Sequence, residues 1–283
     1  MSTAHGGAVA AGAMTVSIHL DGGTYALDLI SPLDISIPLD FHGHQPNAFH
    51  LPQAVAQAAE GGGFIGDTRR GGSCNCETVT LNPHGNGTHT ECVGHITDGR
   101  LSVSRLLRDA LVPCVLVTVT PGPPDTSDDG TGRMDDLAIT RAALDEGLRM
   151  LGDVPAGFFR GLVLRTLPNS IEKKSAWYSG QNPPYVTPAA MRRVRELGVD
   201  HLLLDLPSAD REDDGGRLAA HRIFWEVPDG IREAVPPGSS RTITEMIYVP
   251  DDIPDGLYVL NLQIPPFMLD AAPSRPMLFR IVA

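Results

Sequence analysis

The stretch HGNGTHTECVGH, from His84 to His95, holds the densest group of metal-binding side chains in the chain. Within twelve residues it contains His84, His89, Glu91 and His95. Imidazole and carboxylate groups suit Zn²⁺ and Mn²⁺, and a catalytic site uses about three protein ligands plus an open position for water or substrate. The stretch therefore predicts a divalent metal site.

The spacing of these residues constrains which of them can share an ion. His89 and Glu91 lie two apart, and such residues in an extended strand project from the same face. His95 has the same parity, but it lies roughly 20 Å further along a regular strand. We therefore expect His95 to join the site only if the chain turns near Gly94.

The position of His84 is left open by this argument. It has the opposite parity to His89, so in a regular strand it points away from the site. A bulge at Gly85 or Gly87 shifts the register by one residue and brings it back. The sequence therefore allows His84 either as a ligand or as a bystander.

Composition bounds the class of protein. The chain has 283 residues, 42% of them hydrophobic, which permits a substantial core. Its formal charge of −12 and the lack of a Lys/Arg-rich block argue against nucleic acid or an anionic membrane as partner. No run of apolar residues is long enough to span a membrane. A small-molecule substrate is the expected partner.

The amino-terminal residues and the cysteines bear on compartment and domains. Residues 1–13 lack the basic and Leu-rich parts of a secretory signal, so we expect either a disordered extension or a true start at Met14, before a single domain at 14–283. The four cysteines do not form the paired CxxC motifs of a zinc ribbon, which favours reduced thiols and a cytoplasmic protein. Cys92 has the opposite parity to Glu91 and is expected to pack in the core, while Cys74 and Cys76 remain weaker ligand candidates.

Hydrophobic patterning predicts a mixed α/β fold. The segment 16–29 alternates around DGG and indicates a β-hairpin, while the continuous apolar runs at 114–120 and 161–166 indicate buried strands. An amphipathic helix is predicted over 139–151. Thr187 and Gly198 bracket a second helix, which a buried strand at 199–206 follows. Further expectations are strands at 33–41 and 76–84, a flexible Gly-rich connection at 61–72, and surface loops at 125–132 and 210–216.

Taken together, the motifs resemble those of the cyclase family of metal-dependent hydrolases, which includes kynurenine formamidases and isatin hydrolases. The family pattern is His-x-Gly-Thr-His-x-Asp-x-Pro-x-His, and GTHTECVGH follows its core. LDISIPLDF, LVLRT and LLLDLPSAD are similar to three further family segments in the same order. His221 and Glu245 are similar in position and surroundings to a downstream His and Glu of the family.

The resemblance implies a swivelling β/β/α fold with a central mixed sheet flanked by helices, and a homodimer or homotetramer. It also implies hydrolysis of a small amide, such as an N-formyl or aryl amide or a lactam, by metal-bound hydroxide with one or two Zn²⁺ or Mn²⁺ ions. The implied ligand set is His84, His89, Glu91, His95, His221 and Glu245. Within it, His95, His221 and Glu245 either serve catalysis, the histidines as proton shuttles, or bind a second ion.

Three departures from the family pattern leave a second function open. Glu91 stands in place of Asp, Val93 replaces Pro, and the first His of the pattern falls on Gly85, with His84 one residue early. These differences motivate the alternative of a catalytically silent metal- or ligand-binding relative.

Other polar and aromatic groups are candidates for the surroundings of the site. Asp205, Ser208 and Asp210 either orient ligands or form a turn. Trp177 and Tyr178 are expected either to stack on an aromatic substrate or to pack within a surface loop. The His-rich segment with His42, His44 and His50 either lines the substrate site or binds metal.

Overall fold

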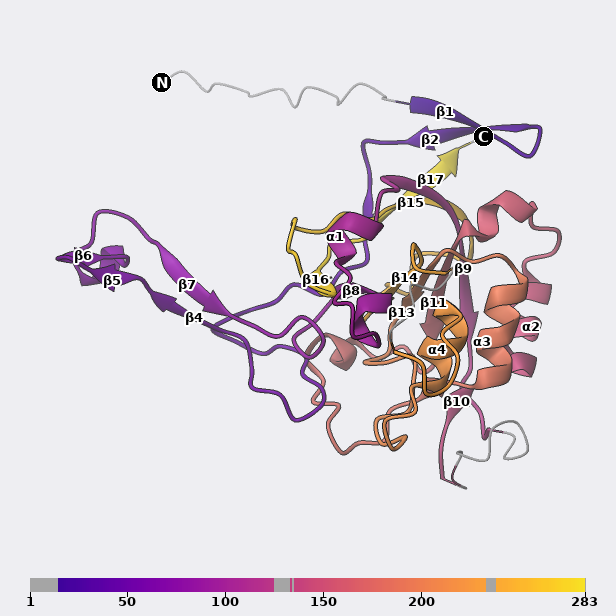
Figure 1. Cartoon of the computed structure of the whole chain (residues 1–283). Coiled ribbons are helices and arrows are strands. Elements are labelled where there is room, and N and C mark those ends of the chain that lie inside the picture. Colours follow the sequence, from indigo (N-terminus) through magenta and orange to yellow (C-terminus); the bar gives the residue numbers. More distant parts are fainter. Residues whose placement is uncertain (1–14, 125–132, 134, 233–237, 283) are drawn as a thin grey trace, which may run out of the picture.

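The computed structural model describes residues 15–124, 133, 135–232 and 238–282. Its centre is an eleven-stranded mixed sheet in the order β1-β2-β17-β15-β9-β11-β13-β14-β8-β16, with β3 paired to β17 (Figure 1). The strands are β1 (Thr15–Leu20), β2 (Gly23–Asp28), β3 (Leu33–Asp34), β8 (His89–Cys92), β9 (Leu111–Val119), β11 (Gly161–Thr166), β13 (His201–Leu204), β14 (Thr242–Glu245), β15 (Gly256–Asn261), β16 (Ala271–Pro273) and β17 (Met277–Val282).

The middle of the sheet is parallel and buried on both faces. β9, β11, β13 and β14 run parallel, while β15 and β8 flank them in the antiparallel sense. Alternate residues of each strand enter two different cores: Leu162 packs towards one face and Val163 towards the other. This is why the runs predicted as buried strands are continuously apolar, and both predictions are confirmed.

Helices cover one face of the sheet through the larger core. They are α2 (Arg141–Met150), α3 (Pro188–Glu196) and α4 (Ala219–Trp225) (Figure 1). Thr187 caps α3 by accepting a hydrogen bond from the Ala190 amide, and Gly198 follows the helix with φ +84°. Both predicted helices are therefore confirmed. A four-residue helix, α1 (Val103–Leu106), and short β10 (Ala138–Ile139) and β12 (Tyr185–Val186) complete the body.

A ribbon of residues 55–80, here called the arm, projects from the body (Figure 1). It contains β4 (Val55–Ala58) paired with β7 (Glu77–Thr80), and β5 (Glu60–Gly61) paired with β6 (Phe64–Ile65). The prediction of a strand at 76–84 is only partly right, since β7 ends at Thr80 and does not join the central sheet. The Gly-rich connection carries β6 and a 3₁₀ turn, Thr68–Arg70, rather than an irregular loop alone.

Two further local predictions need correction. The strand expected at 33–41 is reduced to β3, because the Ile37 amide donates to the Thr88 side chain rather than to a neighbouring strand. The segment 210–216 is not wholly a surface loop: Asp210 and Arg211 are buried, and Arg211 pairs with buried Asp136.

Three further predictions concern residues 1–13, residues 125–132 and membrane-spanning segments. The extension at 1–13 and the loop at 125–132 lie outside the described residues. Within the described segments, every helix is too short or too polar to cross a membrane.

Candidate metal centre

Strand β8 places His89 and Glu91 side by side in the interior. The strand lies between β14 and β16, and all four of its residues are buried. Antiparallel pairing sets Glu245 of β14 opposite His89 and Ala271 of β16 opposite Glu91. The two side chains share a face, as their spacing requires.

His84 enters the site from a turn rather than from a strand. Its amide donates to the Asn82 side chain, and the Asn86 amide donates to the Asn82 carbonyl. His84 Nδ1 lies 3.0 Å from Glu91 Oε2. Strand parity therefore does not apply to His84, and no strand bulge is needed to bring its imidazole to Glu91.

His95 reaches the site because the chain turns directly after β8. The 3₁₀ helix Val93–His95 follows Cys92 and ends the extended conformation of the strand. A Cβ atom on Gly94 would lie 2.0 Å from the Leu101 carbonyl oxygen, so this close approach requires glycine. His95 Nδ1 lies 3.9 Å from Glu91 Oε2.

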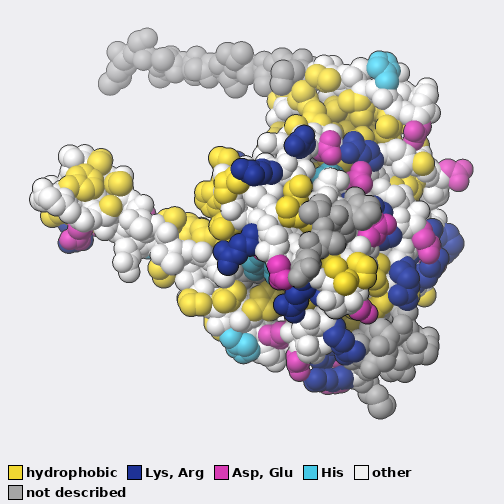
Figure 2. All heavy atoms as spheres, in the orientation of Figure 1, with side chains coloured by type: hydrophobic (Ala, Val, Ile, Leu, Met, Phe, Trp, Pro, Cys, Tyr) yellow, Lys and Arg dark blue, Asp and Glu magenta, His cyan; other side chains and the backbone are white. Residues whose placement is uncertain are grey.

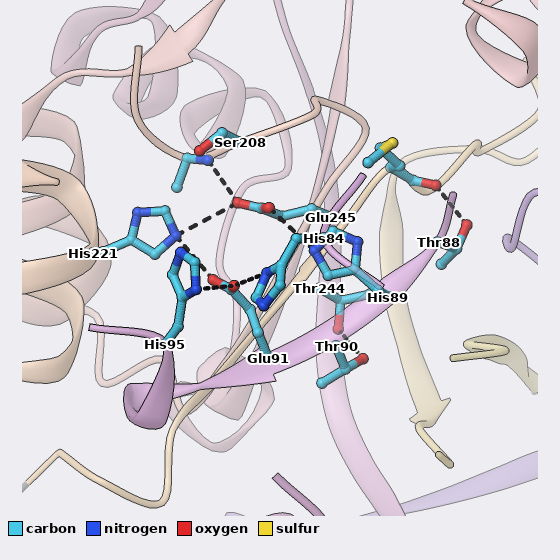
Figure 3. A network of polar contacts seen from close by, with 12 residues as sticks. His84, Thr88, His89, Thr90, Glu91, His95, Ser208, His221, Thr244 and Glu245 are labelled. Carbon is cyan, nitrogen blue, oxygen red and sulfur yellow. Dashed lines mark hydrogen bonds and ion pairs between the residues drawn. The ribbon is translucent and has the colours of Figure 1, made fainter. Parts of the chain in front are cut away.

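Two distant segments complete the group. His221 of α4 places Nε2 2.9 Å from Glu91 Oε1 and 3.7 Å from Glu245 Oε1. Glu245 Oε2 lies 3.4 Å from His89 Nε2, and Glu245 Oε1 accepts a hydrogen bond from the Ala209 amide. Figure 3 shows these side chains pointing toward one another. We call the group the His/Glu cluster; it consists of His84, His89, Glu91, His95, His221 and Glu245.

Two buried ligand atoms of the cluster are left without hydrogen bonds. Within the described residues, His89 Nε2 and Glu91 Oε2 have no hydrogen-bond partner, since the approach of His84 to Glu91 Oε2 lacks hydrogen-bond geometry. Unsatisfied buried polar atoms are costly, and such atoms in natural proteins call for an explanation. Their chemistry, imidazole nitrogen and carboxylate oxygen, fits a divalent cation.

The ligand atoms form two overlapping sets. His84, Glu91 and His95 present atoms within 4.8 Å of one another, and so do His89, Glu91 and Glu245. Glu91 belongs to both sets, so its carboxylate can bridge two ions or serve one. His221 belongs to neither set.

The buried charges of the cluster balance one another. Burial favours the neutral form of Glu91, but the charges of His95 and His221 hold its pKa well below the usual range. Burial also opposes the charged form of His84, yet the Asp270 and Glu91 carboxylates raise its pKa to about 10. The carboxylates raise the pKa of His221 as well as that of His84, so protonated His84 and His221 offset the carboxylate charge. Metal binding to an imidazole nitrogen would release its proton.

Asp210 and Asp270 are not members of the cluster, but each contacts at least one of its histidines. Asp210 Oδ2 lies 2.5 Å from His221 Nδ1, which fits the orienting role considered for it in the sequence. Asp270 Oδ2 lies 2.8 Å from His84 Nε2, and sequence reasoning missed this residue. No motif surrounds Asp270, and it lies far along the chain from the histidines; only the pairing of β16 with β8 brings it close.

A cavity of about 420 Å³ opens beside the cluster. His84, His95, His221 and Glu245 form part of its wall, with Ser208 and Glu212 among the other polar residues. Phe49, Leu51 and Leu218 supply an apolar part of the lining. The cavity is large enough for a small organic molecule with a partly apolar body.

Several candidates from the sequence lie elsewhere. Asp205 accepts hydrogen bonds from Thr166 and Lys173 rather than orienting a cluster residue. Trp177 is 49% exposed, whereas Tyr178 lines a small adjoining cavity with Phe49. The remaining candidates are outside both ligand sets: His42, His44, His50, Cys74, Cys76 and Cys92.

These histidines and cysteines have different surroundings, which explain why they lie outside the ligand sets. His42 faces Glu77 of the arm, and exposed His50 lies 3.9 Å from Glu212 at the cavity rim. Cys92 is buried, its Sγ directed to the Leu101 carbonyl, and burial raises its thiol pKa to about 12. This fits the packing role expected for it.

Comparison with known proteins places the chain in a family. The sequence pattern of the Cyclase family matches residues 28–211, and no curated protein matches the chain. Isatin hydrolase A from Labrenzia aggregata, solved with bound benzyl benzoate, is 15% identical, with a TM-score of 0.59 over 89% of this chain and 94% of that one. Isatin hydrolase A from Ralstonia solanacearum is also 15% identical, with a TM-score of 0.59 over 88% and 91%.

A potential metal-dependent hydrolase with cyclase activity is 17% identical, with a TM-score of 0.55 over 88% of this chain and 98% of that one. These likenesses confirm the predicted α/β fold, because each covers nearly the whole of the solved structure. The matched pattern spans well over half of the chain and includes the β8 segment. The protein therefore belongs to the cyclase family.

Proposed function

We propose that this protein is a metal-dependent hydrolase that cleaves the C–N bond of a small amide, either an N-formyl or aryl amide or a lactam. The observation that carries the proposal is the pair of buried, unpartnered ligand atoms, His89 Nε2 and Glu91 Oε2, in a cluster beside the cavity. Resemblance to isatin hydrolases in fold supports a hydrolase of this class without identifying the substrate.

The two ligand sets assign the residues that would hold metal. His89, Glu91 and Glu245 would hold one Zn²⁺ or Mn²⁺ ion, and His84, Glu91 and His95 a second. When bound, such an ion is a Lewis acid that lowers the pKa of water and stabilises negative charge on a carbonyl oxygen.

His221 is our candidate for proton transfer. It lies outside both ligand sets, so its imidazole remains available when metal is bound. Asp210 holds Nδ1, and Nε2 is directed at the carboxylates beside the cavity. From this position His221 can accept a proton from water at Nε2 and deliver it to the departing nitrogen of the amide.

The cavity suggests how the substrate is held. Phe49, Leu51 and Leu218 can pack against the apolar body of a substrate while its carbonyl group faces the cluster. Binding in this orientation also removes water from the apolar wall, which favours a compact, uncharged substrate body.

Neither main departure from the family pattern favours a catalytically silent relative. His84, although one residue early, lies 3.0 Å from Glu91. Glu91, although longer than Asp, contacts His84, His95 and His221. The displaced His84 and the substituted Glu91 therefore both contribute to the cluster.

Metal content is the first test. Full-length protein purified without a histidine tag is expected to carry one or two equivalents of Zn or Mn per chain and to hydrolyse members of a panel of aryl formamides and lactams. His84→Ala is expected to lose one equivalent, because it removes one member of the second ligand set. His42→Ala, which changes a histidine outside the cluster, is the matched control. Wild-type protein that binds neither ion would refute the proposed function.

We also propose that the protein forms a homodimer through the arm. Every residue of β7 is exposed, and Val55, Phe64 and Val79 are 42%, 40% and 52% exposed. Figure 2 shows hydrophobic side chains gathered on this projection. A two-stranded ribbon is only marginally stable in water, and the free edges of β4 and β7 can pair with the same edges of a second copy.

Light scattering after size-exclusion chromatography tests this proposal. Wild-type protein is expected to elute with the mass of a dimer, and Val79→Lys to shift the mass to that of a monomer by placing charge in the buried contact. Leu111→Lys, which alters an exposed apolar residue of the body, should leave the mass unchanged. A monomeric wild type would contradict the dimer.

A further inference from the structure

Asp270 is a carboxylate that contacts the cluster from the carboxy-terminal part of the chain. It precedes β16 and lies outside residues 28–211, the part that matches the family pattern. Its Oδ2 atom lies 2.8 Å from His84 Nε2 and 3.5 Å from His95 Nδ1. Its side chain is 31% exposed, so it stands at the border between the cluster and solvent.

Two other histidines of the cluster show what such a contact does. His89 Nδ1 lies 3.0 Å from the Gly87 carbonyl oxygen, and His221 Nδ1 lies 2.5 Å from an Asp210 oxygen. A neutral imidazole has one donor and one acceptor nitrogen. An acceptor at Nδ1 therefore fixes the proton there and leaves Nε2, which faces the carboxylates, free to bind metal in His89 and to transfer a proton in His221.

His84 has the same arrangement with its nitrogens exchanged. Asp270 contacts Nε2, and the other nitrogen, Nδ1, lies 3.0 Å from Glu91 Oε2. The backbone holds Asp270 in place, since its carbonyl accepts a hydrogen bond from the Cys92 amide and Ala271 pairs with Glu91. The pairing of β8 with β16 thus fixes the backbone of Asp270 beside Glu91, while the turn at Asn82 fixes His84.

We propose that Asp270 is a positioning residue for the metal centre: it accepts a hydrogen bond from His84 Nε2 and so aims Nδ1 at the ion that Glu91 binds. The inference rests on the proposed metal-dependent function. It assigns Asp270 a role through His84 rather than as a ligand, because Asp270 contacts Nε2 of His84, whereas the nitrogen close to Glu91 is Nδ1.

Cobalt binding by full-length protein stripped of metal tests the assignment. Asp270→Leu is expected to weaken Co²⁺ affinity about 10- to 100-fold, the usual cost of losing an outer hydrogen bond to a ligand. Asp270→Asn keeps an oxygen that can accept from Nε2, so it should retain most of the affinity. Leu269→Ala, an exposed neighbour on the same segment, is the matched control and should bind as wild type.

A second measurement separates positioning from direct ligation. In zinc-loaded protein with ¹⁵N-labelled histidine, an imidazole N–H resonance that His84→Ala removes should persist in Asp270→Asn and disappear in Asp270→Leu. If Asn and Leu weaken Co²⁺ binding equally, Asp270 is a ligand and the inference fails; if neither weakens it, the contact has no role. Failure of wild-type protein to bind Co²⁺ would instead overturn the proposed metal centre itself.

Discussion

Glu91→Gln is expected to remove bound metal and to lower amide hydrolysis by about 10³-fold or more, since Lewis-acid stabilisation is worth several kcal/mol. Glu91 is fully buried and belongs to both ligand sets, so one substitution affects both. Glutamine preserves the shape of the side chain but removes the negative charge that offsets the surrounding imidazoles. Loss of activity and loss of metal should therefore occur together.

Glu91→Asp is the matched variant. It retains the charge and shortens the arm by one methylene, which places at this position the residue that the family pattern contains. We expect it to keep stoichiometric metal with reduced affinity. Elemental analysis and steady-state kinetics on the same preparations give both readouts. Full metal occupancy in Glu91→Gln would show that the ion is bound elsewhere.

His221→Gln is expected to lower kcat by about 10²- to 10⁴-fold while bound metal is retained, because removal of a proton-transfer group costs this much and His221 belongs to neither ligand set. Glutamine can still donate a hydrogen bond to buried Asp210, which limits the damage to folding. KM should change less than kcat, since the substituted group acts on the reacting atoms rather than on the apolar substrate body.

A second buried histidine provides the control for this variant. His201 is buried and lies 2.8 Å from the Thr242 hydroxyl, on a central strand away from the cavity. His201→Gln should alter thermal stability without a selective loss of kcat. If His221→Gln loses metal in parallel with activity, His221 is a ligand and the proton-transfer assignment is wrong.

Much of the fold could be predicted because its determinants are local. The DGG turn between alternating residues specifies the β1–β2 hairpin. Thr187 and Gly198 mark the ends of α3 through hydrogen bonding and left-handed backbone at neighbouring residues. The same-face placement of His89 and Glu91 likewise follows from the two-residue period of a strand.

The position of the His84 side chain could not be predicted from local sequence. Strand parity left its side chain pointing away unless a bulge at Gly85 or Gly87 shifted the register, and both alternatives required a strand that continues from β7 into β8. Side-chain and backbone bonds around Asn82 instead form a turn that delivers the imidazole to Glu91. The sequence shows the residues of this turn but not its contact with a distant segment: the Asn86 side chain donates a hydrogen bond to the Pro52 carbonyl, 34 residues away.

The sequence by itself determined the ligand types, the buried strands β9 and β11, the helices α2 and α3, and the family to which the chain belongs. Only the tertiary structure decided that Glu245 lies opposite His89, that His221 contacts Glu91, and that Asp270 meets His84 across 186 residues of chain. The physical reason is that hydrogen bonding and steric limits between neighbouring residues set local conformation. The pairing of distant strands depends instead on burial and register across the whole sheet, which no short stretch of sequence contains.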